Sequence, residues 1–402
     1  MANRHTITDL YQMQSLPLDD KVQMTKRRID DWVNQFGEDG VYVSFSGGKD
    51  STVLVDIVRN VCGYKDIPLV FVDVPTQYPE LKDFVQNFEN IEILKPKISF
   101  AEVCSKYGFP LFSKEISECI SDSRRYIAIL TDKQTNRQTD KQTNRQTEIP
   151  FAYRIADLIG IDRREDKENK AFADLKMGNI PSEILKAPIR VKQLFGVKCE
   201  DFGSMYDRSK YLFMLNAPFD VSNKCCRIMK KNPAHTYELQ TGRKPIIATM
   251  AYESNLRKSN WIKHGCNSFE SKNPKSNPMS FWTEQDVLWY IVKNKLPICS
   301  VYGEIVVDYT AMKQCENQIS FFDYGIFNDN RSLLRTTKCQ RTGCVLCGFG
   351  CHLEKEGQGR FEMLKKTHPK FHNLIYLLKN NGVTYAEAID WVNEHGGFNI
   401  KY

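Results

Sequence analysis

Hydrophobic positions recur in two periods along the chain, and each period predicts one kind of element. Residues 18–36 carry a partial apolar stripe at helical spacing, which predicts an amphipathic helix. The runs 41–45, 67–74, 91–94 and 245–250 are short, apolar and rich in β-branched residues, and each predicts a buried strand. Strands that alternate with helices predict a doubly wound, mostly parallel sheet of the α/β class, with ligands at the carboxyl ends of its strands.

The stretch VYVSFSGGKDSTVLVDIV, residues 41–58, joins the first strand to a helix through a Ser/Gly turn. Ser46, Gly47 and Gly48 let the backbone turn without obstruction by side chains, and apolar residues recur at helical spacing from Ser51 onward. Backbone N–H groups and the helix dipole then favour an anion at the end of the strand, and Lys49 adds a mobile positive charge. The spacing excludes both G-x-x-x-x-G-K-[ST] and G-x-G-x-x-G. We therefore expect a phosphate cradle of another kind.

Other patterns divide the chain further. Residues 131–146 repeat the octad TDKQTNRQ, and the insertion at about 126–150 predicts a solvated loop or a frayed helix. The segment WTEQDVLWYI predicts a helix with Thr283 as its N-cap, and residues 369–394 predict a helical tail. We expect an N-terminal helical segment (1–37), a nucleotide-binding domain (38–300) and a Cys-rich and helical C-terminal region (301–402).

Composition narrows the class of protein. The chain has 402 residues, 41% of them hydrophobic, which is enough for a large core. It shows neither an apolar run long enough to cross a membrane nor the apolar segment of a signal peptide, so we expect a cytoplasmic protein without a membrane partner. The net charge of +7 and the basic clusters at 26–28, 124–125 and 163–164 suit an anionic substrate or a nucleic acid.

The 13 cysteines gather partly in two places, and in a reducing compartment they suit metal or cluster ligation better than disulfides. Cys225 and Cys226 are adjacent, and neighbouring basic residues favour their thiolates; the alternative is a pair of small buried apolar side chains. The second group is spaced C-x4-C-x2-C-x3-C and comprises Cys339, Cys344, Cys347 and Cys351. On spacing alone, four thiolates suit Zn²⁺ and a [4Fe–4S] cluster equally.

The element SGGKDS resembles the pyrophosphate loop of the PP-loop ATP-pyrophosphatase superfamily. The tandem cysteines, the stretch AYESNLR, the stretch NPMSFWTEQDVLWYI and a downstream C-x-x-C together resemble the phosphoadenylyl-sulfate (PAPS) reductase family of PP-loop proteins. Its cluster-bearing members imply Cys225, Cys226, Cys344 and Cys347 as ligands of a [4Fe–4S] cluster. The related sulfurtransferases of DNA phosphorothioation make Cys339 and Cys351 rival ligands.

The same resemblance implies roles for other residues. Those that bind the nucleotide would be Ser44, Ser46, Gly47, Gly48, Lys49, Asp50, Ser51, Asp73, Tyr78 and Glu253, with Glu80 nearby. Ser113 and Lys114 match a segment that faces the substrate, and Ser254 and Arg257 match a loop that handles anions. Catalysis would rest on Lys49, Asp50, Lys114 and Arg257.

One departure from the family pattern shapes the expected reaction. Its reductases carry a nucleophilic cysteine in a C-terminal Glu-Cys-Gly segment, whereas the last cysteine here is Cys351. Sulfonucleotide reduction then lacks its nucleophile unless Cys351 or Cys266 replaces it. We therefore favour binding of ATP and Mg²⁺, adenylation of an acceptor and iron–sulfur-linked sulfur transfer, with a nucleic acid as a candidate acceptor.

Two alternatives remain open, as do the partners. The chain could be a reductase that takes adenylyl sulfate and releases sulfite, or a nucleotide-binding subunit without catalysis. Candidate partners are a cysteine desulfurase or another sulfur or electron donor, and the chain could form a homo-oligomer or join a complex. His264, Cys266 and His352 could be ligands, bases or packed structure.

Overall fold

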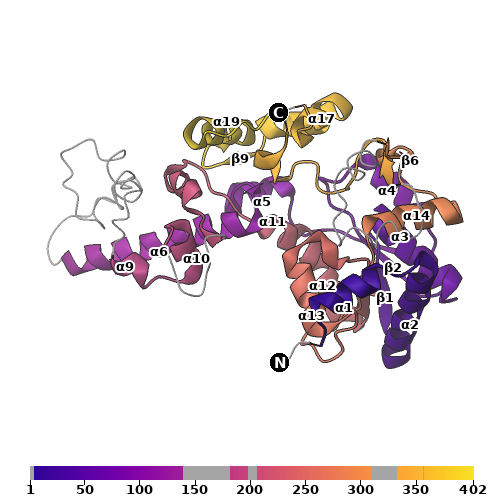
Figure 1. The fold of residues 1–402 in the computed structure, drawn as a ribbon. Coiled ribbons are helices and arrows are strands. Elements are labelled where there is room, and N and C mark those ends of the chain that lie inside the picture. Colours follow the sequence, from indigo (N-terminus) through magenta and orange to yellow (C-terminus); the bar gives the residue numbers. More distant parts are fainter. Residues whose placement is uncertain (1–3, 139–181, 198–205, 310–332, 356) are drawn as a thin grey trace. The chain divides into compact units, whose positions relative to one another are not determined.

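The computed structural model describes residues 4–138, 182–197, 206–309, 333–355 and 357–402. At residues 131–138 it describes the backbone only. These residues form two compact units, each built from two stretches of chain. The first unit comprises residues 1–97 and 229–344, and the second comprises 98–228 and 345–402. Figure 1 traces both, and each is described separately below.

The first unit contains a four-stranded parallel sheet in the order β3-β2-β1-β5. Its strands are β1 (Val41–Ser44), β2 (Leu69–Val72), β3 (Ile91–Leu94) and β5 (Lys244–Ile247). Its helices are α1 (Ile7–Gln14), α2 (Leu18–Phe36), α3 (Lys49–Asp56), α4 (Pro79–Val85), α12 (Asn232–Thr241), α13 (Asn255–His264) and α14 (Glu284–Asn294). The α/β class, the parallel sheet and the four expected strands are confirmed.

Shorter elements complete this unit. A π-helical turn, η1 (Ile57–Val61), extends α3, and η4 (Arg227–Lys231) leads into α12. Two 3-10 turns, η5 (Ala251–Glu253) and η6 (Ser300–Tyr302), follow β5 and α14. Strands β6 (Ile305–Val307) and β7 (Leu334–Thr336) form a separate antiparallel pair.

Alternate residues of the sheet pack against helices on opposite faces. Val43 and Phe45 belong to the main core together with side chains of α2, α3 and α14. Tyr42, the residue before Val43, packs instead with Val70 and with Tyr237 of α12. Because successive side chains of a strand point to opposite faces, helices cover both sides of the sheet. This is the doubly wound arrangement that the sequence predicts.

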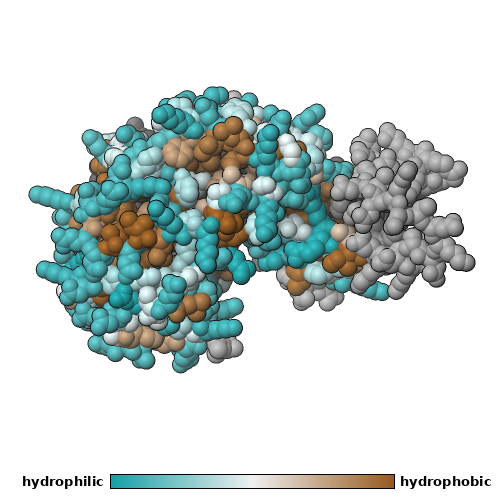
Figure 2. All heavy atoms as spheres, turned by 180° about the vertical axis from the view of Figure 1, so that it is seen from behind, coloured by the Kyte–Doolittle hydropathy of each residue, from teal (hydrophilic) through white to brown (hydrophobic). Residues whose placement is uncertain are grey.

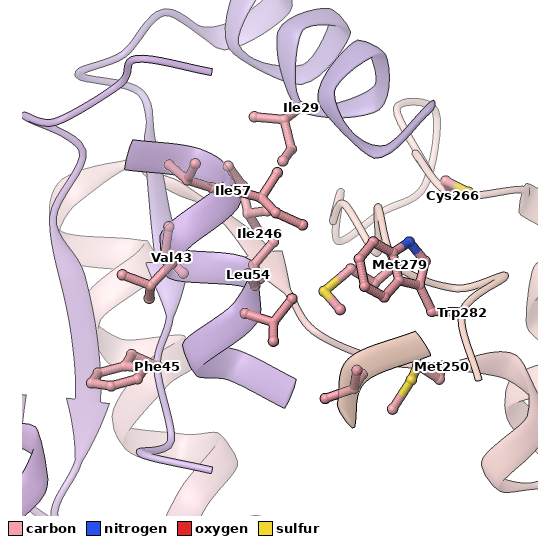
Figure 3. Close-up of a cluster of buried hydrophobic side chains, with 14 of the residues drawn as sticks. Ile29, Val43, Phe45, Leu54, Ile57, Ile246, Met250, Cys266, Met279 and Trp282 are labelled. Atoms are coloured by element: carbon pink, nitrogen blue, oxygen red, sulfur yellow. The ribbon is translucent and has the colours of Figure 1, made fainter. Parts of the chain in front are cut away.

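The main core extends well beyond the sheet. Figure 3 shows Ile29, Leu54 and Ile57 on one side of Ile246, with Met279 and Trp282 on the other. The Trp282 indole donates a hydrogen bond to Thr25 Oγ1 at 2.8 Å. Thr283 caps α14 in the predicted capping box with Asp286. The segment that follows α13 therefore closes the core over α2.

The second unit is mostly helical. Its helices are α5 (Phe100–Tyr107), α6 (Lys114–Gln138), α9 (Ser182–Leu185), α10 (Ile189–Leu194), α11 (Lys224–Cys226), α17 (Arg360–Thr367), α18 (Pro369–His372) and α19 (Tyr385–Gly396). Its 3-10 turns are η3 (Ser209–Asn216), η7 (Cys351–Leu353) and η8 (Asn373–Tyr376). Strands β4 (Leu111–Phe112) and β8 (Gly348–Phe349) pair in parallel, and β9 (Lys379–Asn380) pairs with β10 (Val383–Thr384) in an antiparallel hairpin. Helix α6 continues through the first polar octad, and the second octad lies outside the described residues.

Two sequence-based expectations need correction in this unit. The expected helical tail 369–394 is helical in α18, η8 and α19, but the β9–β10 hairpin interrupts it. Asn381 and Gly382 have φ of +49° and +83°, a conformation typical of tight hairpin turns. The basic pair at 124–125 does not present both charges to a ligand, since Arg124 is largely buried. Its guanidinium donates to the carbonyls of Met214, Ala217 and Phe219 and contacts Asp220.

Polar side chains dominate one face of the molecule. The face in Figure 2 is mostly hydrophilic and is interrupted by separate hydrophobic patches. In the part of the chain that the structure describes, no helix combines the length and apolar character needed to cross a bilayer.

A buried imidazole makes the stability of the second unit sensitive to pH. His372 of α18 is buried, and burial followed by the charge of Lys365 lowers the pKa of its imidazole below the usual 6.5. Between that lowered pKa and 6.5 the unfolded chain binds more protons than the folded one, so stability falls as pH falls. We expect the unfolding temperature to drop less between pH 7.5 and 5.5 in His372→Gln than in the unmodified chain.

The control for this experiment is His235→Gln, because His235 is mostly exposed and belongs to the first unit. It should leave the pH dependence unchanged. Identical pH profiles for His372→Gln and the unmodified chain would contradict the prediction.

Candidate phosphate-binding site

The Ser/Gly turn forms a tight loop between β1 and α3. Gly47 has a φ of +71°, which favours glycine, and an added Cβ there would lie 2.9 Å from Val85 Cγ2. The Ser51 hydroxyl accepts a hydrogen bond from the Ser46 amide at 3.2 Å and lies 3.0 Å from Ser46 Oγ. Gly48 precedes the first residue of α3. The loop is therefore held in shape by its own hydroxyl groups and by the absence of a side chain at Gly47.

Lys49 carries a buried positive charge at the start of α3. Only 3% of its surface is exposed. Its ammonium nitrogen lies 3.0 Å from the Gln340 carbonyl oxygen, 3.2 Å from Glu284 Oε1 and 3.7 Å from Asp50 Oδ1. The charge is thus held inside the unit by one carbonyl and two carboxylates.

Residues from the far end of the first unit close around the loop. The Lys49 amide donates to the Tyr302 hydroxyl at 3.1 Å, and that hydroxyl lies 2.9 Å from Thr342 Oγ1. Sequence reasoning missed Tyr302, Gln340 and Thr342. These residues lie some 250 to 290 positions from the loop in sequence. Gln340 and Thr342 stand inside the cysteine motif, between Cys339 and Cys344, but that motif points to metal ligation and not to contact with the loop.

Charges of both signs surround the loop. Burial raises the pKa of the Asp50 carboxyl, Lys49 opposes that shift, and Glu284 adds to it. Glu253 is ion-paired with Arg257 and lies 4.0 Å from Arg341. Burial, followed by the nearby Arg341, lowers the pKa of the Arg257 guanidinium. Carboxylates and cationic side chains thus lie next to one another beside the loop.

The structure places the remaining predicted residues in several environments. Ser44 is the last residue of β1, and Ser254 caps α13. Asp73 follows β2 and pairs with Lys82 at 2.5 Å, while Tyr78 precedes α4, which contains Glu80. Ser113 and Lys114 belong to the second unit, at the start of α6. The first unit therefore brings together Lys49, Asp50, Glu253 and Arg257.

Comparison with known proteins assigns the chain to a family. The model of the phosphoadenosine phosphosulfate reductase domain matches residues 40–125 and 165–348, more than half of the chain. The chain belongs to this family. The match spans the loop, the tandem cysteines and most of the C-terminal cysteine run. It supports nucleotide binding as a property of the family.

Similar chains are found among solved structures but not among curated proteins. A solved structure that resembles the chain is the crystal structure of phosphoadenylyl-sulfate reductase from Candida auris in a phosphate complex, with 15% identity and a TM-score of 0.32. The similarity covers 71% of this chain and 88% of that one. No curated protein matches the chain significantly.

Several of the family's candidate cysteines surround one phenol in the second unit. Tyr385 is fully buried and stacks on Phe109 with ring centroids 4.6 Å apart. Its pKa is raised well above 10, first by burial and then by thiols of Cys351, Cys347, Cys104 and Cys225. One member of the tandem pair and two members of the C-terminal run are therefore within electrostatic range of the same hydroxyl.

The backbone around the C-terminal run is well fixed. Arg360 donates to the Cys347 carbonyl at 2.9 Å and pairs with Glu354 at 2.6 Å. The Cys351 thiol donates to the Gly348 carbonyl at 2.8 Å, and burial raises its pKa to about 12. His352 is neutral at pH 7, since burial and Lys210 lower its pKa to about 4. Its Nε2 lies 3.0 Å from the Tyr211 hydroxyl.

The predicted metal ligands are divided between the two units. Within the described ranges, no three or more His, Cys, Asp or Glu side chains are arranged to hold a metal ion together. Cys225, Cys226, Cys347 and Cys351 belong to the second unit, and Cys339 and Cys344 belong to the first. The [4Fe–4S] cluster and Zn²⁺ stay predictions that iron, sulfide and zinc analysis can test. No step proposed below runs through them.

Proposed function

We propose that the chain binds ATP on the loop 46–51 and cleaves it between the α- and β-phosphates to adenylate an acceptor. The observation that carries this proposal is the buried ammonium of Lys49, held at the start of α3 beside loop amides in a family of nucleotide-binding proteins. A buried lysine with one carbonyl partner can exchange that partner for a phosphate oxygen. The exchange improves its charge pairing, because a phosphate oxygen carries more negative charge than a carbonyl oxygen.

The surrounding residues would bind and orient the triphosphate. Loop amides and the hydroxyls of Ser46 and Ser51 would donate to the β- and γ-phosphates. Mg²⁺ beside Asp50 would favour the ionised carboxylate against the effect of burial, which raises its pKa. Arg257 would stabilise negative charge that develops at the α-phosphorus. Lys114 lies in the second unit, and its proposed part in this step rests on the family resemblance.

Adenylation needs no redox step. An acceptor hydroxyl oxygen gives up its proton and attacks the α-phosphorus, the bond to the bridging oxygen breaks, and pyrophosphate leaves. The acceptor now carries AMP as a leaving group. A donor protein such as a cysteine desulfurase carries sulfur as a persulfide, whose terminal sulfur attacks the acceptor atom that bears the adenylated oxygen, and AMP leaves with that oxygen. Two equivalents of an added thiol then reduce the resulting acceptor–donor disulfide, which leaves a thiol on the acceptor and on the donor and oxidises the added thiol to its disulfide.

The proposal is tested by comparing two substrates with purified, anaerobically prepared protein. ATP with Mg²⁺ and a sulfur donor should yield AMP and pyrophosphate, with release dependent on an acceptor-containing extract. Adenylyl sulfate or phosphoadenylyl sulfate with a thiol reductant should yield little sulfite. ATP binding without release of any product would overturn adenylation in favour of a nucleotide-binding subunit.

The reductase is the second candidate, because the matching family is named for that activity. Reduction needs a thiolate, and the two cysteines considered as replacements for the missing nucleophile are poorly suited. Burial raises the pKa of both Cys266 and Cys351. Sulfite release that persists in Cys266→Ser and Cys351→Ser would assign the nucleophile to another cysteine.

A further inference from the structure

A cationic groove lies in the first unit beside the carboxyl end of β5. Its walls are the segment after β5, helix α13 and the loop 266–277, and its cavity measures about 560 Å³. We call it the cationic groove and define it by Lys231, Arg257, His264, Lys272 and Lys275. Ligands of a parallel α/β sheet collect at the carboxyl ends of its strands, so the groove lies where a substrate is expected.

The lining of the groove carries charge of one sign. Four of its side chains are Lys or Arg, and none is Asp or Glu. Lys231, Lys272 and Lys275 are exposed and have no ion pair with any residue that the structure describes. Arg257, the fourth, is instead paired with Glu253, as Lys49 of the Ser/Gly loop is with Glu284. The groove therefore holds three positive charges that no described residue compensates by an ion pair.

The groove is also held in shape by the backbone. The Ile247 amide donates to the Ser276 carbonyl at 2.9 Å, and the Ser276 amide donates to the Pro245 carbonyl at 3.0 Å. The Ser268 hydroxyl bonds both the amide and the carbonyl of Lys275. These bonds attach the loop 266–277 to the edge of the sheet. Its lysines are consequently presented by a fixed turn, and less ordering is needed when a ligand binds.

Arg257 connects the groove to the phosphate loop. It lines the groove and pairs with Glu253, which lies 4.0 Å from Arg341, the residue after Gln340, whose carbonyl oxygen contacts the Lys49 ammonium. A ligand in the groove would therefore reach toward the position proposed for the nucleotide phosphates. This arrangement suits a second substrate better than a remote effector.

We propose that the cationic groove binds a phosphate group of the acceptor substrate. Uncompensated lysines together with serine hydroxyls and asparagine amides are suited to a phosphate ester, which combines full negative charge with several acceptor oxygens. The phosphate can come from a small phosphorylated metabolite or from the backbone of a polynucleotide. Binding in the groove stands independently, whereas the ligand's role as acceptor rests on the proposed function.

The test compares two variants with equal loss of charge. Lys272→Gln/Lys275→Gln removes two groove lysines, and Lys65→Gln/Lys263→Gln removes two exposed lysines of the same unit that do not line the groove. The probes are inorganic phosphate, followed by calorimetry, and a fluorescein-labelled 12-nucleotide single strand, followed by anisotropy at two salt concentrations. We expect the groove variant to weaken binding at least about tenfold and the control variant to weaken it less than about twofold.

The two probes separate the sources of the phosphate. Tight, salt-dependent binding of the strand, with a shallower salt dependence in the groove variant, identifies a polynucleotide. Binding of inorganic phosphate, with no tighter binding of the single strand, identifies a small phosphorylated molecule as the ligand. Equal weakening in both variants, or no binding of either probe, overturns the proposal.

A second readout separates this proposal from the proposed function. Lys49→Gln should leave probe binding in the groove intact, and the groove variant should still bind ATP. If the groove binds its probe but no acceptor makes the chain cleave ATP, adenylation fails and the groove stands. If ATP is cleaved but neither probe binds, the groove proposal fails alone.

Discussion

Replacing Lys49 by glutamine is expected to lower ATP-dependent release of pyrophosphate by at least about 100-fold. The Lys49 ammonium is buried at the start of α3 and lies 3.0 Å from the Gln340 carbonyl oxygen. Glutamine can keep a hydrogen bond to that carbonyl, but it cannot supply charge to a phosphate. The measurement is pyrophosphate release at saturating ATP together with the dissociation constant for ATP.

The matched control is Lys65→Gln, which removes an exposed lysine of the same unit. Its rate should stay within about twofold of the unmodified chain, and circular dichroism should show that both variants are folded. If Lys49→Gln retained full turnover, the proposed role of the loop would be wrong. A loss of turnover with unchanged ATP affinity would assign Lys49 to the transition state rather than to ground-state binding.

Replacing Asp286 by alanine is expected to destabilise the first unit by about 3–5 kcal/mol, the usual cost of breaking a buried ion pair. Asp286 Oδ2 lies 2.7 Å from the Lys21 ammonium, and both side chains are almost completely buried. The variant would leave the Lys21 charge without its counterion inside the core. The measurement is the free energy of unfolding in urea, followed by tryptophan fluorescence, because Trp32, Trp261, Trp282 and Trp289 all belong to this unit.

Two further variants separate the ion pair from the helix cap. Asp286 also accepts hydrogen bonds from the amide and hydroxyl of Thr283, so Thr283→Ala should cost only about 1 kcal/mol. Lys21→Met/Asp286→Leu removes both charges and should recover part of the stability lost in Asp286→Ala. A double variant as unstable as Asp286→Ala would show that the cost comes from packing and capping rather than from the unpaired charge.

Local patterns predict most of the first unit. The helix over residues 18–36 and the strands β1, β2, β3 and β5 are present where periodicity places them. The Thr283 capping box is also confirmed, because it depends on residues three positions apart. The helical tail expected over 369–394 is interrupted, because an Asn-Gly turn forms a hairpin within it. Turn chemistry over two residues there outweighs helical spacing over many.

The residues of the candidate site likewise include some that the sequence predicts and some that it does not. The residues of the loop and the anion-handling stretch can be named from motifs, since each motif is contiguous in sequence. Tyr302, Gln340, Thr342 and Glu284 contact the loop region through tertiary packing. Three of them lie within the cysteine motif or the helix motif WTEQDVLWYI, but neither motif predicts contact with the loop. Arg124 is the opposite case. In the sequence it belongs to a basic pair that suits an anionic ligand, but in the folded chain it donates hydrogen bonds to backbone carbonyls of its own unit.

By itself, then, the sequence determined most elements of the first unit, the parallel α/β class, the Ser/Gly loop and the family, because periodicity and contiguous motifs act over short separations. Only the tertiary structure decided which charges face one another. It paired Lys49 with Glu284, buried most of Arg124 and left the lysines of the cationic groove without an ion pair among the described residues. The physical reason is that Coulomb and desolvation energies depend on distance and burial in space, which separation along the chain does not predict.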